Sequence, residues 1–324
     1  FDIRTISKDY RKKHILVIGD IILDAYVYGK VNRISQEAPV PIVSVERKEF
    51  KPGGAANVAL NLAGLGSKVT LMGIVGKDKN NEHLRSCMNE QKHINYNVLK
   101  SESRPTTVKT RIIADNRQLA RLDSEVTHEI PDEIISAITD KIIENIKNID
   151  GIIIQDYNKG LLTPSLIKNI IDHSDNYEIP VYVDPKYNNY SSYKGVRLFK
   201  PNLVEYNAIA KEDEFGSLPK SGFIFKDYMQ SEILLLTRGS SGMLIYYDGI
   251  QKSIPTKARQ VFDVSGAGDT VIATFALNDL CGVDPINSAI IANLAAGRVC
   301  EDVGVSPITL DSLIDFFSHH YNMD

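Results

Sequence analysis

The sequence has few cysteines and no long apolar run. Cys87, Cys281 and Cys300 are the only three in 324 residues, and their spacing does not match a metal site. We therefore expect free thiols in a reducing compartment rather than disulfides or metal ligands. No apolar stretch is long enough to span a bilayer, and no signal peptide is recognisable. We expect a cytoplasmic protein that does not bind membranes.

Basic residues are not in excess either. The chain has 37 Lys and Arg against 41 Asp and Glu, a formal net charge of −4 at pH 7. Proteins that bind nucleic acids carry clustered positive charge, so this composition gives no support for such a partner. The Lys and Arg residues are dispersed, which predicts that any phosphate they bind is bound locally.

Short apolar runs alternate with amphipathic stretches of helical length. This alternation is typical of a mostly parallel sheet with helices on both faces. Without an internal repeat or a long linker, we predict one domain over residues 1–324. The expected strands are His14–Asp20, Val69–Val75, Gly151–Gln155, Val181–Asp184, Arg197–Lys200 and Ile233–Thr237, and the expected helices include residues 82–90, 131–147, 164–173 and 287–299.

Two segments interrupt this pattern. Residues of about 25–50 and 106–122 are rich in β-type residues with alternating polarity. Short two-sided strands inserted into an α/β body predict a small separate sheet, which acts as a lid or as a dimer surface. Edge hairpins that only cover the core are the alternative.

The run Gly266-Ala267-Gly268-Asp269 precedes an apolar stretch that predicts a helix. Backbone N–H groups at a helix start form an anion site, yet Asp269 places a carboxylate there. A general base beside amides that stabilise an arriving phosphoryl group explains both features. A structural turn with an ordinary acidic residue in the first helical turn is the alternative.

A second glycine-rich turn, Gly53-Gly54, lies shortly before Asn57. It lets a ligand approach the backbone closely, and the Asn57 amide can bond sugar hydroxyls as donor and acceptor; close packing of a helix start is the alternative. No Gly-Lys-Ser/Thr follows, which excludes a Walker A loop. Asp20 and Asp24 are placed either to bind adjacent hydroxyls, or for Asp20 to cap a turn while Asp24 faces solvent.

Asn202 and Glu205 follow a strand end with the spacing of a capping box, which is a sufficient structural explanation. The functional alternative places both near nucleotide phosphates and Mg²⁺, through water.

Thr237, Gly239 and Gly242 form a loop that suits a phosphate or a ribose, or a plain hairpin. Lys186 adds a cation at the carboxyl edge of the sheet, where a substrate phosphate can pair with it.

The order of the Gly53-Gly54 turn, the Asn202 and Glu205 pair and the Gly266–Asp269 run resembles the PfkB, or ribokinase, family of sugar kinases. Asp263-Val264-Ser265 departs conservatively from the Asp-Thr-Thr or Asp-Val-Thr that is common there. The resemblance covers nearly the whole chain. It implies a ribokinase-like α/β fold with a small β-sheet lid, and an ATP-dependent enzyme that uses Mg²⁺ and in several relatives a monovalent cation such as K⁺.

The resemblance also implies residue roles. Asp269 would be the general base, and the N–H groups of Gly266, Ala267 and Gly268 would form the anion hole. The other implied contacts are with sugar hydroxyls (Asp20, Asp24, Gly53, Gly54, Asn57), with the nucleotide and its Mg²⁺ (Asn202, Glu205, Thr237, Gly239, Gly242), and with a monovalent cation (Asp263, Ser265).

Within the family, Gly19-Asp20 with Asp24, residues 33–41, 109–111 and 118–123, Asp156–Gly160 and Asp184–Lys186 resemble the branch that phosphorylates the anomeric hydroxyl of D-glycero-β-D-manno-heptose 7-phosphate. That reaction makes the 1,7-bisphosphate for ADP-heptose and lipopolysaccharide core synthesis. The substrate phosphate would contact residues among Lys109, Arg111, Arg121 and Lys186.

No nucleotidyltransferase motif follows the kinase motifs, so we expect the heptose 1-phosphate adenylyltransferase to be a fused or separate partner. We also expect a homodimer through the lid strands. Two other functions stay open: another sugar or nucleoside kinase of the family, and a non-catalytic sugar- or nucleotide-binding regulator. The intact Gly-Ala-Gly-Asp run speaks against a regulator, because a binding protein has no use for a base there.

Overall fold

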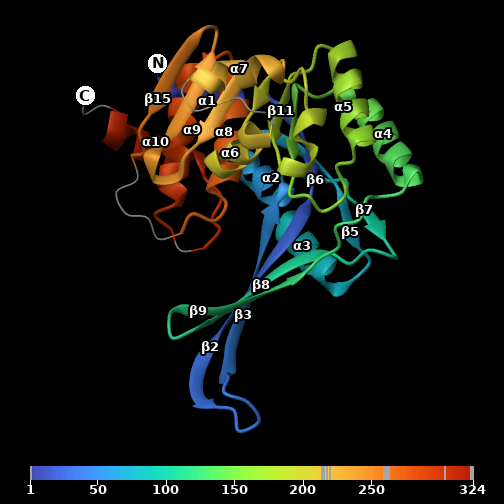
Figure 1. Ribbon diagram of the computed structural model, residues 1–324, viewed down its shortest axis with the longest axis vertical. Coiled ribbons are helices and arrows are strands. Elements are labelled where there is room, and N and C mark those ends of the chain that lie inside the picture. Colours follow the sequence, from blue (N-terminus) through green and yellow to red (C-terminus); the bar gives the residue numbers. More distant parts are fainter. Residues whose placement is uncertain are drawn as a thin grey trace.

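The computed structural model describes residues 2–212, 216, 218, 220–257, 263–302 and 304–321. Its main feature is a nine-stranded sheet (Figure 1). The strands from β13 to β6 run parallel to their neighbours, and β14 and β15 add an antiparallel hairpin at one edge. In spatial order they are β15 (Ile250–Ile254), β14 (Met243–Tyr247), β13 (Ile233–Thr237), β12 (Leu198–Phe199), β11 (Val181–Asp184), β10 (Gly151–Gln155), β1 (His14–Gly19), β4 (Lys68–Met72) and β6 (Ile94–Tyr96).

Alternation along the strands divides the apolar side chains between two cores. In β1, Ile15 and Val17 face one core, while Leu16 and Ile18 face the other. The first core is covered by α1 (Ile3–Tyr10), α2 (Ala55–Gly64), α3 (Lys79–Asn89), α8 (Ala267–Leu280), α9 (Pro285–Val299) and α10 (Leu310–Tyr321). The second is covered by α4 (Asp132–Ile146), α5 (Pro164–Asn176), α6 (Leu203–Glu212) and α7 (Lys220–Tyr228). Helices on both faces explain why the strands are apolar runs.

A four-stranded sheet extends away from this body (Figure 1). Its strands, in spatial order, are β3 (Pro41–Gly54), β2 (Ile21–Ile34), β8 (Thr107–Ala114) and β9 (Arg117–Ser124). Only Asp20 separates β1 from β2, and β3 runs directly into α2. The small sheet therefore starts directly at the carboxyl end of β1 and leads directly into α2, without a linker at either connection.

The fold class is confirmed, with two local corrections. The expected strand over Val69–Val75 divides at Gly73 into β4 and β5 (Ile74–Gly76), and β5 pairs instead with β7 (Leu99–Ser101). A Cβ on Gly73 would lie 2.7 Å from the Gly19 carbonyl oxygen, so the chain leaves the sheet where only glycine fits. The strand expected over Arg197–Lys200 is reduced to the two residues of β12.

The three cysteines are free thiols. In the ranges that the structure describes, no helix has the length and apolarity needed to cross a membrane. Within the same ranges, no three His, Cys, Asp or Glu side chains gather in a way that would hold a metal ion.

Candidate active site

Helix α8 begins at the glycine-rich turn. Gly266 is the residue before the helix and has φ of 80°, a conformation that glycine adopts without strain. The Ala267 N–H donates to the Val264 carbonyl at 3.2 Å, so this amide is used within the turn. The Ala267 N–H is therefore not free to contribute to an anion hole, contrary to the prediction. The N–H groups of Gly268 and Asp269 lie in the first helical turn, where they have no acceptor inside the helix.

Asp269 is buried, with only 3% of its surface exposed. Its Oδ2 accepts a hydrogen bond of 2.7 Å from Asn57 Nδ2. Its Oδ1 accepts bonds from Gln155 Nε2 at 3.1 Å and from the Tyr157 hydroxyl at 2.8 Å. Burial raises the pKa of Asp269 to about 7, the nearby Asp184 carboxylate adds to the rise, and the bonds from Asn57 and Tyr157 oppose it. A carboxyl group with this pKa is matched to general-base chemistry near neutral pH.

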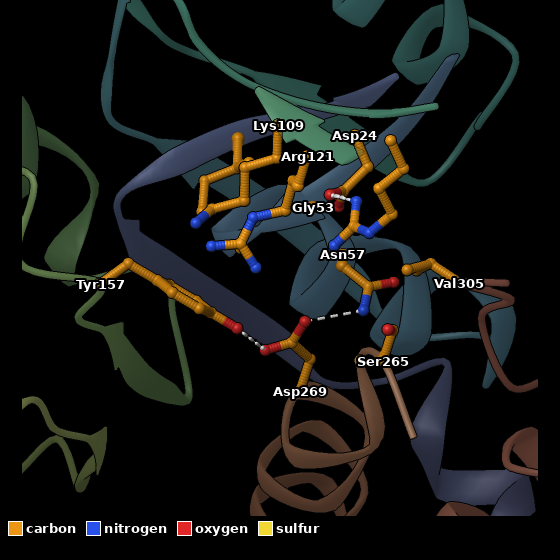
Figure 2. A pocket seen from close by; sticks show the side chains of 13 residues that line it. Asp24, Gly53, Asn57, Lys109, Arg121, Tyr157, Ser265, Asp269 and Val305 are labelled. Carbon is orange, nitrogen blue, oxygen red and sulfur yellow. Dashed lines mark hydrogen bonds and ion pairs between the residues drawn. The ribbon is translucent and has the colours of Figure 1, made fainter. Parts of the chain in front are cut away.

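Asp269 lies at the edge of a cavity of about 200 Å³ (Figure 2). Ten of the candidate residues line this cavity, from the small sheet, α2 and the turn before α8: Asp24, Gly53, Gly54, Asn57, Lys109, Arg111, Arg121, Ser265, Gly266 and Asp269. The others that line it are Ile22, Tyr157 and Val305. The structure thus brings together segments separated by more than 200 residues.

Three cations gather on the small sheet at this cavity. Arg111 and Arg121 are direct cross-strand partners, and Lys109 is the partner of Asp123. Like charges directly opposite each other destabilise a sheet, so this arrangement needs acidic partners or an anion.

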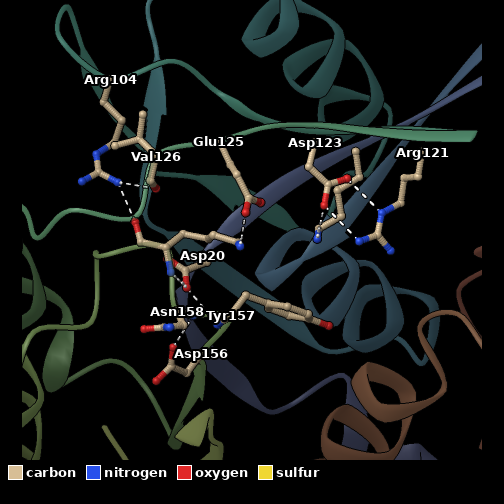
Figure 3. Close-up of polar contacts among 11 residues, drawn as sticks. Asp20, Arg104, Arg121, Asp123, Glu125, Val126, Asp156, Tyr157 and Asn158 are labelled. Carbon is tan, nitrogen blue, oxygen red and sulfur yellow. Dashed lines mark hydrogen bonds and ion pairs between the residues drawn. The ribbon is translucent and has the colours of Figure 1, made fainter. Parts of the chain in front are cut away.

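The acidic partners are two aspartates. Arg111 pairs with Asp24. Asp123 is shared by Arg121, at 2.9 Å from Nε, and by Lys109 Nζ, at 3.7 Å (Figure 3). Within this group, three cations meet two carboxylates, so one positive charge remains for an anionic ligand.

Asp24 is 5% exposed, so the alternative in which it faces solvent is wrong. Strand β2 begins immediately after Asp20 and carries Asp24 to the cavity wall. Gly53 lies on the neighbouring strand β3 as the partner of Ile22, and a Cβ there would be 2.3 Å from Asp24 Oδ2. The glycine is therefore needed for the Asp24 carboxylate to lie against the backbone of β3.

Asp20 does not line the cavity. Its Oδ2 accepts hydrogen bonds from the backbone N–H groups of Tyr157 at 2.8 Å and Lys159 at 3.1 Å (Figure 3). Burial raises the pKa of Asp20 to about 7, and the nearby Asp156 carboxylate contributes. The predicted contact of Asp20 with sugar hydroxyls is therefore corrected: Asp20 holds the loop that follows β10.

Lys186 is not at the cavity either. Its Nζ pairs with Glu205, which lies in the first turn of α6. Glu205 Oε2 accepts from the Asn202 N–H, and Asn202 Oδ1 accepts from the Glu205 N–H, both at 2.9 Å. The capping box is therefore present, and of the four cations considered for the substrate phosphate Lys186 lies apart from the other three.

Of the nucleotide candidates, Thr237 ends β13, and Gly239 and Gly242 lie in the turn between β13 and β14, which pair as a hairpin. An isolated bridge joins Asn202 to Thr237, so the two groups of candidates are neighbours. They lie outside the cavity, as do Asp263 and the first two residues of α8, Ala267 and Gly268. Asp263 Oδ1 accepts a bond of 2.8 Å from the Ser265 N–H.

Sequence reasoning missed Gln155 and Tyr157. It used the Asp156–Gly160 run as part of the resemblance to one branch of the family, without asking which faces its side chains take, although successive residues of an extended chain point to opposite faces. Asp156 contacts the Asn158 N–H and the Tyr193 hydroxyl on the far side. Applying the alternation to residues 155–157 would have placed its two neighbours together on the opposite face.

Comparison with known proteins finds relatives by sequence and by fold. Bifunctional protein HldE of Coxiella burnetii (strain Dugway 5J108-111) is 39% identical over 309 residues, which is 94% of this chain and 63% of that protein. Bifunctional protein HldE of Helicobacter pylori (strain G27) is 38% identical over 303 residues, 93% of this chain and 65% of that protein. The chain therefore spans a little under two thirds of the length of these relatives.

Solved structures share the fold at low identity. Phosphofructokinase-2 from Escherichia coli in complex with potassium superposes with a TM-score of 0.78 at 15% identity, covering 95% of this chain and 99% of that one. Ribokinase from Arabidopsis thaliana complexed with ribose and ATP gives a TM-score of 0.72 at 17% identity, covering 94% and 98%.

The fold is ribokinase-like, and its site combines a buried carboxylate at a glycine-rich helix start with a cationic cavity. This combination defines a kinase of small hydroxyl compounds. Residues 12–311 match the pfkB family of carbohydrate kinases, and the chain belongs to that family.

Proposed function

We propose that the protein phosphorylates the anomeric hydroxyl of D-glycero-β-D-manno-heptose 7-phosphate with ATP, making the 1,7-bisphosphate for ADP-heptose and lipopolysaccharide core synthesis. The observation that carries the proposal is one cavity lined both by Asp269 and by the cations Lys109, Arg111 and Arg121. A sugar that already bears a phosphate matches both features. The similarity to two bifunctional HldE proteins supports the same branch of the family.

In the proposed reaction, Asp269 takes the proton of the anomeric hydroxyl. The sugar oxygen then forms a bond to the γ-phosphorus of ATP as the bond to the β–γ bridging oxygen breaks, and ADP leaves. The N–H groups of Gly268 and Asp269, in the first turn of α8, stabilise the charge on the transferred group. Phosphoryl transfer depends on alignment and charge neutralisation more than on covalent chemistry of the protein.

The 7-phosphate is assigned to Lys109 and Arg121. These two cations share one carboxylate, Asp123, whereas Arg111 has Asp24 as its own partner. Lys186 is left out because it pairs with Glu205 away from the cavity. Arg111 and Asp24 then face the sugar hydroxyls, together with Gly53, Gly54 and Asn57, which line the same cavity.

The nucleotide is assigned to Asn202, Glu205, Thr237, Gly239 and Gly242, which form one neighbouring group. Both oxygens of Glu205 already have partners in the protein. Because Mg²⁺ keeps several waters and is held largely by substrate phosphates, Glu205 fits a water-mediated contact rather than direct ligation. The metal would supply neutralisation of the phosphate charge.

Asp263 and the Ser265 carbonyl are assigned to a monovalent cation. Asp263 Oδ1 is used by the Ser265 N–H, no described residue is recorded as a donor to Oδ2, and carboxylate and carbonyl oxygens suit an alkali cation. The potassium complex of phosphofructokinase-2 concerns that protein, and it motivates the same test here. Activity in KCl should exceed activity in tetramethylammonium chloride at equal ionic strength.

A homodimer through the small sheet is part of the proposal. Four apolar side chains on its strands are exposed by 42–59%: Ile34, Val45, Leu119 and Leu122. Apolar exposure of this kind is typical of an interaction surface. Light scattering should give twice the chain mass, and Leu122→Lys should lower it. The adenylyltransferase activity would come from a fused or separate partner, with both acting in the cytoplasm.

The test is a substrate panel with ATP: the heptose 7-phosphate, ribose, fructose 6-phosphate and adenosine, followed by bisphosphate formation and ADP release. The heptose 7-phosphate should have the highest kcat/KM. Faster turnover of ribose, fructose 6-phosphate or adenosine would assign the protein to another sugar or nucleoside kinase of the family. Binding of sugar and ATP without any turnover would assign it to the non-catalytic regulators.

A further inference from the structure

The carboxylate of Asp269 is held unequally at its two oxygens. Among the described residues, Oδ1 accepts two hydrogen bonds, from Gln155 and Tyr157, while Oδ2 accepts one, from Asn57. Figure 2 shows the bonds from Tyr157 and Asn57. We propose that Tyr157 is a positioning residue for phosphoryl transfer: with Gln155 it fixes Oδ1 of Asp269, so that Oδ2 is the atom that takes the proton from the sugar. This inference rests on the proposed role of Asp269 as the general base.

The count of lone pairs supports this assignment. A carboxylate offers about four acceptor positions, two on each oxygen. The two donors at Oδ1 occupy both of its positions, whereas among the residues that the structure describes Oδ2 has only the bond from Asn57 and keeps one position open. A sugar hydroxyl entering the cavity therefore finds one free acceptor on the base, which sets the orientation of its proton.

Gln155 is itself rigidly placed. Its Nε2 also donates to Asp184 Oδ2 at 3.0 Å, and the side chain is 1% exposed. Asp184 in turn pairs with the buried Lys200, whose Nζ lies 3.0 Å from Oδ2. The amide of Gln155 is oriented by two carboxylates, both of which need a donor, so its nitrogen rather than its oxygen faces Asp269.

Tyr157 is fixed from the other direction. Its backbone N–H donates to Asp20 Oδ2 at 2.8 Å, and its ring lies 5.4 Å from Lys186 Nζ. Burial, together with the charge of Asp269, raises the pKa of Tyr157 well above its usual value. The hydroxyl therefore stays protonated and acts as a donor, and it cannot compete for the proton of the sugar.

Tyr157→Phe removes one donor and keeps the ring that lines the cavity. Oδ1 then regains a free lone pair, and the carboxylate can turn away from the sugar. We expect kcat to fall about tenfold to a hundredfold, the range for a hydrogen bond to a charged group, with the KM for the heptose 7-phosphate changed less than about threefold. The lost donor should also move the acid limb of kcat/KM about one pH unit upward.

A readout without substrate makes the test independent of the proposed reaction. The protein is labelled with ¹³C at the aspartate carboxyls, the Asp269 signal is assigned from its loss in Asp269→Asn, and the signal is titrated. In Tyr157→Phe this carboxyl should titrate about one unit higher than in the wild type. If the wild type fails to phosphorylate the heptose 7-phosphate, the proposed substrate is wrong, while this titration still decides the role of Tyr157.

Tyr182→Phe is the matched control. It removes a tyrosine hydroxyl that donates at 2.7 Å to Asp279, near the other end of the same helix α8. This variant should leave the Asp269 titration and kcat unchanged. An unchanged titration and kcat in Tyr157→Phe would overturn the proposal, and so would equal effects in both variants. A lower KM at full kcat would also overturn it, because the Tyr157 hydroxyl would then compete with the sugar hydroxyl for Asp269 instead of positioning the carboxylate.

Discussion

Asn57 and Asp269 are 212 residues apart, and a hydrogen bond of 2.7 Å from Asn57 Nδ2 to Asp269 Oδ2 joins them in the buried floor of the site. The bond connects the first turn of α2 to the first turn of α8, which also pack against each other in the core. Because both helices begin at glycine-rich turns, the two sequence motifs meet at one carboxylate. The chemistry of that carboxylate can be tested directly.

Asp269→Asn should lower turnover by about two to four orders of magnitude, because an amide cannot take the proton of the sugar. The amide nitrogen would also face a donor, either Asn57 or the pair Gln155 and Tyr157. The measurement is kcat with the heptose 7-phosphate, with circular dichroism to check the fold. Asp311→Asn, an exposed substitution on α10, is the control, and full activity in Asp269→Asn would refute the assigned base.

The wild-type activity should depend on pH through Asp269. A base works only when deprotonated, and burial raises the pKa of Asp269 to about 7. We therefore expect kcat/KM to rise with pH up to about 7 and to level off above it. A profile between pH 5 and 9, measured with saturating ATP, tests this. An acid limb near pH 4 would mean that the carboxyl is not desolvated in the active protein.

Asp20→Asn tests the second buried carboxyl through stability. The pKa of Asp20 is raised from 3.8 to about 7, so the folded protein holds this proton over a pH range in which the unfolded chain has lost it. The associated stability is complete below pH 3.8 and is lost as pH rises to 7. Relative to the wild type, the variant should gain about 2–3 kcal/mol between pH 5 and pH 8.

The measurement is urea unfolding of both proteins at the two pH values. Asp311→Asn controls for the loss of one negative charge. A stability difference between Asp20→Asn and wild type that is the same at pH 5 and pH 8 would contradict a raised pKa at Asp20.

Much of the fold could be predicted because buried parallel strands are continuous apolar runs that end at polar residues. The site was less accessible to this reasoning. Asp24 was expected either to bind sugar or to face solvent, and the sequence does not reveal that β2 starts at Ile21 without a loop. Asp20 could not be assigned because its donors, Tyr157 and Lys159, are 137 and 139 residues away.

The division of the strand at Gly73 has a similar cause. An apolar run predicts burial, but the partner strand depends on contacts that are distant in sequence. The close approach of Gly73 to Gly19 arises only when β1 and β4 are paired.

The two glycines of the Gly266–Asp269 run should respond differently to alanine. Gly266 has φ of 80°, and a Cβ there would lie 2.7 Å from Asn57 Nδ2. Gly268 lies within the helix, and its Cβ would meet nothing closer than 3.6 Å. Gly266→Ala should therefore lower the free energy of unfolding by at least about 1–2 kcal/mol, whereas Gly268→Ala should leave it within about 0.5 kcal/mol or raise it. Equal losses in urea unfolding would contradict this view of the turn.

Arg121→Gln tests the assignment of the phosphate end. The charge of Asp123 is shared by Arg121 and Lys109, so the variant leaves Asp123 with Lys109 alone and removes the uncompensated positive charge. The KM for the heptose 7-phosphate should rise about tenfold to a hundredfold, as for other hydrogen bonds between charged groups. Arg117→Gln, an exposed substitution at the start of β9, is the control. Unphosphorylated heptose distinguishes a contact with the phosphate from a contact with the sugar. If its KM rises in Arg121→Gln as much as that of the 7-phosphate, Arg121 contacts the sugar and the phosphate must lie elsewhere. A rise in KM confined to the 7-phosphate assigns the guanidinium to the phosphate.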